Sequence, residues 1–87
     1  MNKYERIPQY ILDLHQHTRA EAQRALDVLC TKKSYAHVRI ITGKGLHSKN
    51  GPVIKDFVYL YLKNKGITFR QSKIADGGEG AVEVFWE

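Results

Sequence analysis

Two short segments hold side chains whose types and spacing suit acid–base chemistry on a phosphate. In the first, Asp13 and His15 stand two positions apart in an apolar stretch, and in an extended strand such side chains share a face, roughly 6.5–7 Å apart along the chain. The ordinary pKa of an imidazole, near ~6.5, suits proton transfer at neutral pH. A neighbouring carboxylate either orients the imidazole or holds a divalent metal such as magnesium. We therefore predict that Asp13 and His15 are catalytic and that Asp13 is the candidate metal ligand.

The second segment is Thr42-Gly43-Lys44-Gly45, which follows another apolar run. Its glycines are expected to turn backbone N–H groups toward a ligand, and a helix predicted to begin at Pro52 offers the positive end of its dipole to a phosphate. Together with Lys49, the four residues form the predicted phosphate-binding and nucleic-acid-binding set. His47 is a candidate general acid. The segment matches neither the Walker A pattern nor the dinucleotide fingerprint, so no nucleotide cofactor is expected.

The elements that position these segments follow from periodicity. Apolar and alternating stretches predict strands over residues 10–15, 38–42, 67–74 and 81–86. Helical spacing predicts helices over 19–33, which opens with a capping box at Thr18 and Glu21, and from Pro52 to a cap at Gly66. Trp86 shares a strand face with Val82 and Val84 and is expected to be packed.

This β-α-β-α-β-β order predicts an α/β fold: a single-domain two-layer sandwich with a mixed four-stranded sheet and two main helices. Right-handed crossovers make the first strands parallel, and a turn at 76–80 makes the last two strands an antiparallel hairpin. The apolar first strand is expected to be covered on both faces. Residues 1–8 form a lead-in and residues 9–87 the domain. Ligands of such sheets bind beyond the carboxyl ends of the parallel strands, so the two polar segments are expected to converge on one cleft.

Composition narrows the class of protein. Eighty-seven residues allow one domain, and 43% hydrophobic with 26% charged residues excludes a disordered chain. No run approaches the ~20 apolar residues that span a bilayer, so no membrane partner is expected. The single cysteine, Cys30, excludes an internal disulfide, and we expect a cytoplasmic protein. A net charge of +5 suits a nucleic-acid partner, whereas nothing in the composition indicates an oligomeric state.

Three motifs, in their order and spacing, resemble those of the Smr (small MutS-related) domain, in its stand-alone form. The resemblance covers about residues 9–87. The segments that carry it are Leu12-Asp13-Leu14-His15 with Thr18 and Glu21-Ala22, then Ile41-Thr42-Gly43-Lys44-Gly45 with His47-Ser48 and Gly51, and then Gly77-Gly78-Glu79-Gly80-Ala81-Val82-Glu83-Val84.

The resemblance implies an α/β sandwich and an endonuclease that hydrolyses phosphodiester bonds of DNA or RNA, acting as a nickase or as a ribonuclease. It implicates Asp13, His15 and the 42–45 loop in cleavage. One departure is Gln16, which stands where the family often has glycine directly after the histidine. The alternative function is a non-catalytic DNA- or RNA-binding module that uses the same basic loop. Asp13 separates the two functions, because a carboxylate beside a phosphate helps only if it takes part in chemistry, binds a metal or orients His15.

Overall fold

The structure is a computed structural model that describes residues 7–44 and 53–86. The strands and helices follow in the predicted order. They are β1 (Tyr10–Asp13), α1 (Arg19–Lys32), β2 (His37–Ile41), α2 (Val53–Asn64), β3 (Thr68–Gln71), the 3-10 turns η1 (Ile74–Asp76) and η2 (Gly78–Gly80), and β4 (Ala81–Phe85). Three predicted features lie outside the described residues: most of the lead-in, the set of site residues Gly45, His47 and Lys49, and the helix start at Pro52.

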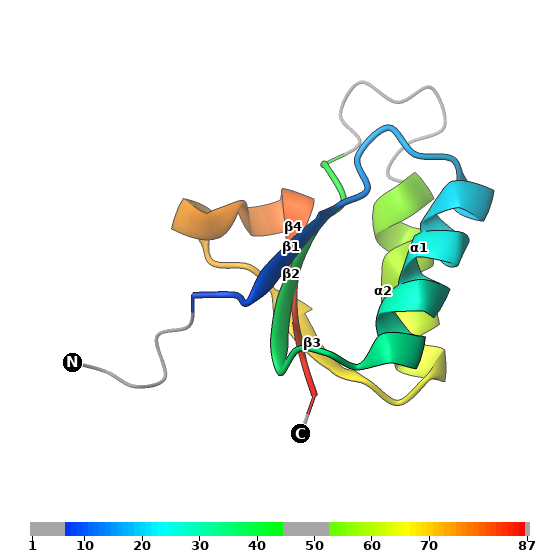
Figure 1. The fold of residues 1–87 in the computed structure, drawn as a ribbon. Helices are drawn as coiled ribbons and strands as arrows, with labels where there is room; N and C mark the ends of the chain where they lie inside the picture. Colours follow the sequence, from blue (N-terminus) through cyan, green and yellow to red (C-terminus); the bar gives the residue numbers. More distant parts are fainter. Residues whose placement is uncertain (1–6, 45–52, 87) are drawn as a thin grey trace.

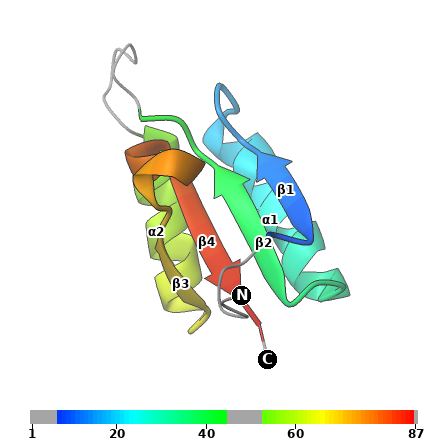
Figure 2. The same cartoon turned by 90° about the vertical axis from the view of Figure 1, so that its left-hand side faces the viewer.

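The four strands form one mixed sheet in the order β1-β2-β4-β3. β1 and β2 are parallel, as the right-handed crossover predicts, and β4 runs antiparallel to both of its neighbours, β2 and β3. Both helices cover the same face of the sheet, while η1 and η2 lie on the other side (Figure 1). Figure 2 shows the face turned away from the helices, with β1 and β3 at the two edges. The expected two-layer α/β sandwich with a terminal hairpin is confirmed.

The core lies between the sheet and the helices. Alternate residues of β2 and β4 point into it, and Val38, Ile40, Val82 and Val84 are fully buried there. Trp86 is half-buried against the same core, as its shared face with the two β4 valines predicts. In the described ranges, no helix has the length and apolar character that crossing a membrane requires.

The helix ends confirm the predicted capping signals. Thr18 accepts a hydrogen bond from the Glu21 backbone N–H at 3.1 Å, and the Glu21 carboxylate accepts one from the Thr18 backbone N–H at 2.8 Å. After α2, Gly66 adopts a φ of 69°, and the Ile67 N–H reaches back to the Leu62 carbonyl at 3.0 Å. Glycine suits this left-handed position, which ends the helix and turns the chain toward β3.

Two predictions about strands are wrong. β1 is not covered on both faces: it is the edge strand, it ends at Asp13, and Tyr10 and Ile11 are 41% and 52% exposed. A short apolar run gives no information about how many faces are covered, and here both helices pack on one side. β3 is also shorter than residues 67–74, because the chain leaves the sheet after Gln71 and enters η1.

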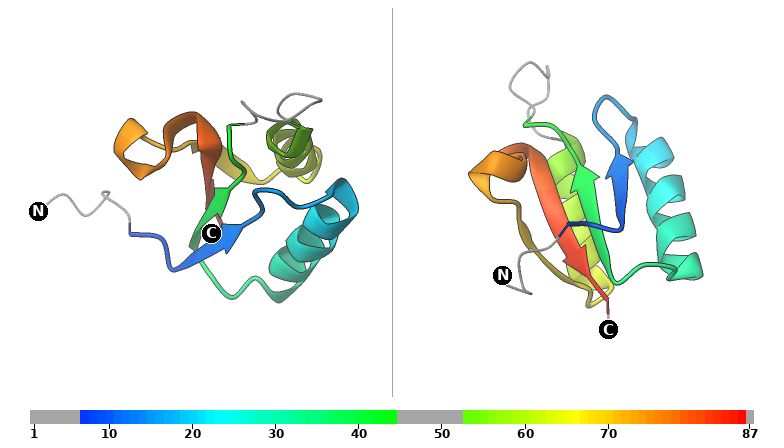
Figure 3. Two further views of the ribbon diagram at one scale, coloured as in Figure 1. Left: turned by 90° about the horizontal axis from the view of Figure 1, so that it is seen from above. Right: turned by 60° about the vertical axis from the view of Figure 1, so that its left-hand side comes forward.

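The topology brings three chain segments to one end of the sheet. β1 and β2 are parallel and therefore end there together, and β4 begins there after η2 (Figure 3). The two segments predicted to carry chemistry follow β1 and β2 and therefore lie at this end of the sheet. Whether they form one site depends on the contacts between their side chains.

Candidate functional site

The first segment folds into a tight turn directly after β1. Buried Leu14 anchors it, and the Leu14 carbonyl accepts a hydrogen bond from the His17 N–H at 3.1 Å. Gln16 has a φ of 66°, in the left-handed region that favours glycine. The preference for glycine after the histidine therefore has a physical cause, and Gln16 adopts the same conformation with a strained backbone.

Asp13 and His15 form a pair within this turn. The Asp13 carboxylate oxygen Oδ1 lies 2.5 Å from His15 Nδ1 and also accepts the His15 backbone N–H at 3.1 Å. The two side chains are 54% and 51% exposed. The side-chain hydrogen bond from His15 lowers the pKa of Asp13 below its ordinary value. Because Nδ1 is bound to a carboxylate that stays ionised, Nε2 is the ring nitrogen left to meet a ligand from solution.

The second segment lies against this pair. Gly43 has a φ of 74°, and a Cβ atom built on it would lie 3.4 Å from the His15 Cβ atom. Thr42 is buried, and its hydroxyl donates to the Gly43 carbonyl at 2.9 Å. Lys44 is exposed. The structure therefore brings Gly43 together with His15, and Lys44 follows at the solvent-facing side of the same loop.

The backbone of this loop differs from expectation in one respect. The N–H groups of Thr42 and Gly43 do not point toward a ligand, because both donate to the Gly80 carbonyl, at 2.9 and 3.0 Å. Within the described residues, Gly43 thus contributes a close backbone approach beside His15 and not an N–H donor for phosphate. The side chain of Lys44 is the cationic group that the described part of the loop offers.

Gly80 is a residue of the site that the sequence did not predict. A Cβ atom there would lie 3.3 Å from Lys44 Cγ and 3.4 Å from the Gly43 carbonyl carbon. Any larger side chain would push the loop away from the start of β4. The glycine cluster around residues 77–80 was the signal, but it was interpreted as a turn between strands and as part of the third motif, and not as part of the site.

A second polar cluster, also unforeseen, lies on the sheet face away from the helices. Its centre is Glu83 of β4, which is 2% exposed. The Glu83 carboxylate lies 2.5 Å from His37 Nε2 and accepts hydrogen bonds from Arg39 Nε at 2.7 Å and from the Ser72 hydroxyl. Burial raises the pKa of Glu83, but the hydrogen bonds from Ser72, Arg39 and His37 together outweigh it, and the net pKa is lowered. This cluster joins β2, β4 and the chain after β3.

The described residues do not form a metal centre. They contain no group of three or more His, Cys, Asp or Glu side chains able to hold an ion. Asp13, the predicted ligand, directs one oxygen to His15.

Comparisons with known proteins identify the family and the fold. The Smr domain family model matches residues 12–87. The crystal structure of the human small-MutS related domain is 29% identical, with a TM-score of 0.68, over 87% of this chain and 99% of that one. The Smr domain of Thermus thermophilus MutS2 is 22% identical, with a TM-score of 0.74, over 90% and 98%. YdaL, a stand-alone small MutS-related protein from Escherichia coli, is 20% identical, with a TM-score of 0.70, over 91% and 68%.

None of the curated proteins compared with the chain matches it. The family match covers most of the chain, from the first polar segment to the last strand, and the fold and the three motifs agree with it. The chain belongs to the Smr domain family.

Proposed function

We propose that this domain is an endonuclease that cleaves phosphodiester bonds in nucleic acid, with Asp13 and His15 as its acid–base pair. The observation that carries the proposal is the 2.5 Å contact between two half-exposed side chains beside Gly43. A net charge of +5 supports a polyanionic partner. The single cysteine, Cys30, is free, which fits a reducing, cytoplasmic setting.

His15 is the proton-transfer group in this mechanism. Asp13 holds the ring through Nδ1 and fixes Nε2 as the atom that exchanges a proton with the substrate. The ionised carboxylate also stabilises the imidazolium that forms when Nε2 takes up a proton. Of the two roles that the sequence left open for Asp13, orientation of His15 is the one the geometry supports.

The nucleophile depends on the nucleic acid. On RNA, His15 takes the proton of the neighbouring 2′-hydroxyl, the 2′-oxygen forms a bond to phosphorus, and the bond from phosphorus to the 5′-oxygen breaks. The departing 5′-oxygen receives a proton from an acid, for which His47, outside the described residues, is the candidate. On DNA no 2′-hydroxyl exists, and His15 would instead activate water. In both cases Lys44 offsets the charge that develops on the phosphate.

The loop that follows β2 binds the substrate in this proposal. Gly43 lets the sugar–phosphate backbone approach His15 without a side chain in the way. Lys44 is exposed at the same place, and Gly45 and Lys49 extend the predicted binding set along the chain. Phosphate contacts of this kind bind nucleic acid with little regard to sequence.

The test is a cleavage assay with supercoiled DNA beside a structured RNA, each with and without a chelator. Asp13→Asn is expected to abolish cleavage and to keep or strengthen binding, because it removes a negative charge near the phosphate. Loss of cleavage in the presence of the chelator would show that the reaction requires a divalent metal such as magnesium. If wild type and Asp13→Asn bind both nucleic acids equally and cut neither, the domain is a non-catalytic binding module and the proposal is wrong.

A further inference from the structure

The outer edge of β1 is open to another strand. β1 ends the sheet, and within the described residues only β2 pairs with it. Natural sheets protect such edges with lysine, proline or a bulge, since unpaired N–H and C=O groups there attract another chain. β1 has the sequence Tyr-Ile-Leu-Asp and exposes Tyr10 and Ile11. Its edge therefore offers both backbone hydrogen bonds and apolar contact.

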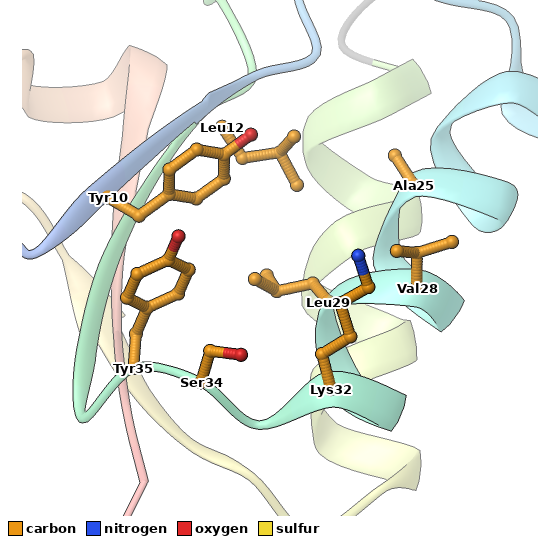
Figure 4. Close-up of a pocket in the computed structure, with 8 residues that line it drawn as sticks. All are labelled: Tyr10, Leu12, Ala25, Val28, Leu29, Lys32, Ser34 and Tyr35. Atoms are coloured by element: carbon orange, nitrogen blue, oxygen red, sulfur yellow. The ribbon is translucent and has the colours of Figure 1, made fainter.

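A groove runs beside this edge, between β1 and α1 (Figure 4). Its cavity has a volume of about 430 Å³. Leu12 lines it from the strand, and Ala25, Val28 and Leu29 line it from the helix. Val28 is 53% exposed, although it is an aliphatic residue. An apolar side chain that entered the groove would cover Val28 and gain burial against both β1 and α1.

Aromatic and polar groups complete the lining of the groove. Tyr10 and Tyr35 stack with their ring centroids 5.0 Å apart and form a flat wall. Lys32 and Ser34 also line the groove, and the Lys32 amino group, the one side-chain nitrogen among the residues drawn, lies beside Leu29 on the α1 side (Figure 4). The lining thus combines an apolar floor with a cation and hydroxyl donors, which together suit an apolar side chain next to a carboxylate.

We propose that this groove binds an extended acidic peptide segment of another protein, which pairs with the outer edge of β1 and places an apolar side chain between β1 and α1. Peptides bind in this way when a free strand edge lies beside a side-chain pocket. A carboxylate of the peptide meets Lys32. A second copy of the chain is a poorer occupant, because both copies carry a net charge of +5. Nucleic acid is also a poorer occupant, because the groove is mainly apolar and offers it one cation.

A random twelve-residue peptide library displayed on phage tests this proposal, with the whole chain as the immobilised target. The enriched peptides are expected to alternate apolar residues with Asp or Glu. In the complex with a synthetic peptide of the consensus sequence, hydrogen exchange of the β1 amides should slow, because strand addition protects them. Failure to enrich any peptide, or enrichment of basic peptides, would overturn the proposal.

Two substitutions with matched controls locate the binding site. Val28→Lys places a charge in the groove, and Lys32→Glu reverses its cation; each should weaken the consensus peptide by about tenfold or more. The controls lie on α2: Leu60→Lys alters an aliphatic residue that is 57% exposed, and Lys63→Glu alters the basic residue of the last turn. The controls should leave affinity unchanged.

Circular dichroism of each variant separates loss of binding from loss of folding, since all four positions are exposed. Equal losses in groove and control variants would show that the peptide binds elsewhere, and the proposal would fail. A single-stranded oligonucleotide that displaces the peptide, and whose own binding is weakened by Val28→Lys, would assign the groove to nucleic acid instead.

Discussion

Two histidine–carboxylate pairs with the same contact distance lie in opposite environments in this domain. Asp13 and His15 meet at 2.5 Å with both side chains half-exposed, and Glu83 and His37 meet at 2.5 Å with side chains that are 2% and 6% exposed. The carboxylate of each pair has a lowered pKa, so both remain ionised at neutral pH. Distance and charge state alone therefore do not distinguish a reacting pair from a structural one.

Access and partners distinguish the two pairs. Glu83 binds Arg39 and Ser72 as well as His37, and its cluster connects separate strands across the sheet. Asp13 binds only groups of His15 among its described hydrogen bonds, and the pair lies against Gly43 at an open end of the sheet. We infer that the buried pair stabilises the fold and that the exposed pair carries the chemistry.

The largest expected effect is on catalysis. His15→Ala should lower the rate of cleavage at saturating substrate by about 10²–10⁴-fold, because it removes the proton-transfer group. The melting temperature should hardly change, since an exposed side chain contributes little to stability. The control is His17→Ala, which removes a neighbouring exposed histidine whose ring Nδ1 lies 3.3 Å from the His15 carbonyl oxygen. A wild-type rate in His15→Ala would refute the assignment.

The next largest effect is on stability. Glu83→Gln should lower the free energy of unfolding by about 3 kcal/mol, because Arg39 and His37 lose a buried charged partner. The cleavage rate per folded molecule should stay at the wild-type value. Urea titration measures the first quantity. Glu79→Gln is the matched control: this carboxylate is 69% exposed, lies 4.0 Å from Lys55, and should matter little. If the two variants unfold with the same free energy, the buried Glu83–His37 pair does not stabilise the fold as inferred.

Acid unfolding should show the same difference between the pairs. A carboxylate whose pKa is lowered in the folded state contributes its full stability at any pH above its ordinary pKa, which is 4.5 for glutamate. That contribution is lost as the pH falls through the folded-state pKa. Wild type should therefore lose stability below pH 4.5. Glu83→Gln should remove most of this pH dependence, and Asp13→Asn only a small part, because Asp13 is exposed. The check is urea midpoints measured from neutral to acid pH; the reverse ranking would contradict the account.

The smallest effect concerns backbone strain in the site turn. Gln16→Gly should raise the free energy of unfolding by about 0.5–1 kcal/mol, because Gln16 already occupies the left-handed conformation that glycine adopts freely. Lys33→Gly, at the end of α1 with a φ of 48°, should give a similar gain far from the site. Neither change should alter the cleavage rate. A gain in rate for Gln16→Gly alone would show that the glutamine side chain obstructs the pair.

Local signals in the sequence predicted most of the fold. The capping box at Thr18 and Glu21 and the helix end at Gly66 depend on neighbouring residues, and the structure confirms both. The expected coverage of β1 on both faces was wrong, because coverage depends on which side of the sheet the helices pack against. Both helices pack on one side (Figure 1), and no local pattern in the sequence encodes that choice.

The residues of the two polar clusters were predicted or missed for the same reason. Asp13 and His15 were found because they stand two positions apart in the sequence, so their contact is local even though β1 ends at Asp13. Glu83 and its partners were missed because His37 is 46 positions away and Arg39 is 44 positions away. Their pairing depends on the register between β2 and β4, as does the approach of Gly80 to Gly43.

The most direct test of the central claim is a double-mutant cycle on the exposed pair. Single-turnover cleavage rates would be measured for wild type, Asp13→Asn, His15→Ala and the double variant at saturating protein. If Asp13 acts by orienting His15, the double variant should be as slow as His15→Ala alone, because the carboxylate has nothing left to orient. If the two losses multiply, or if all four proteins cleave at one rate, Asp13 and His15 do not act as a catalytic pair.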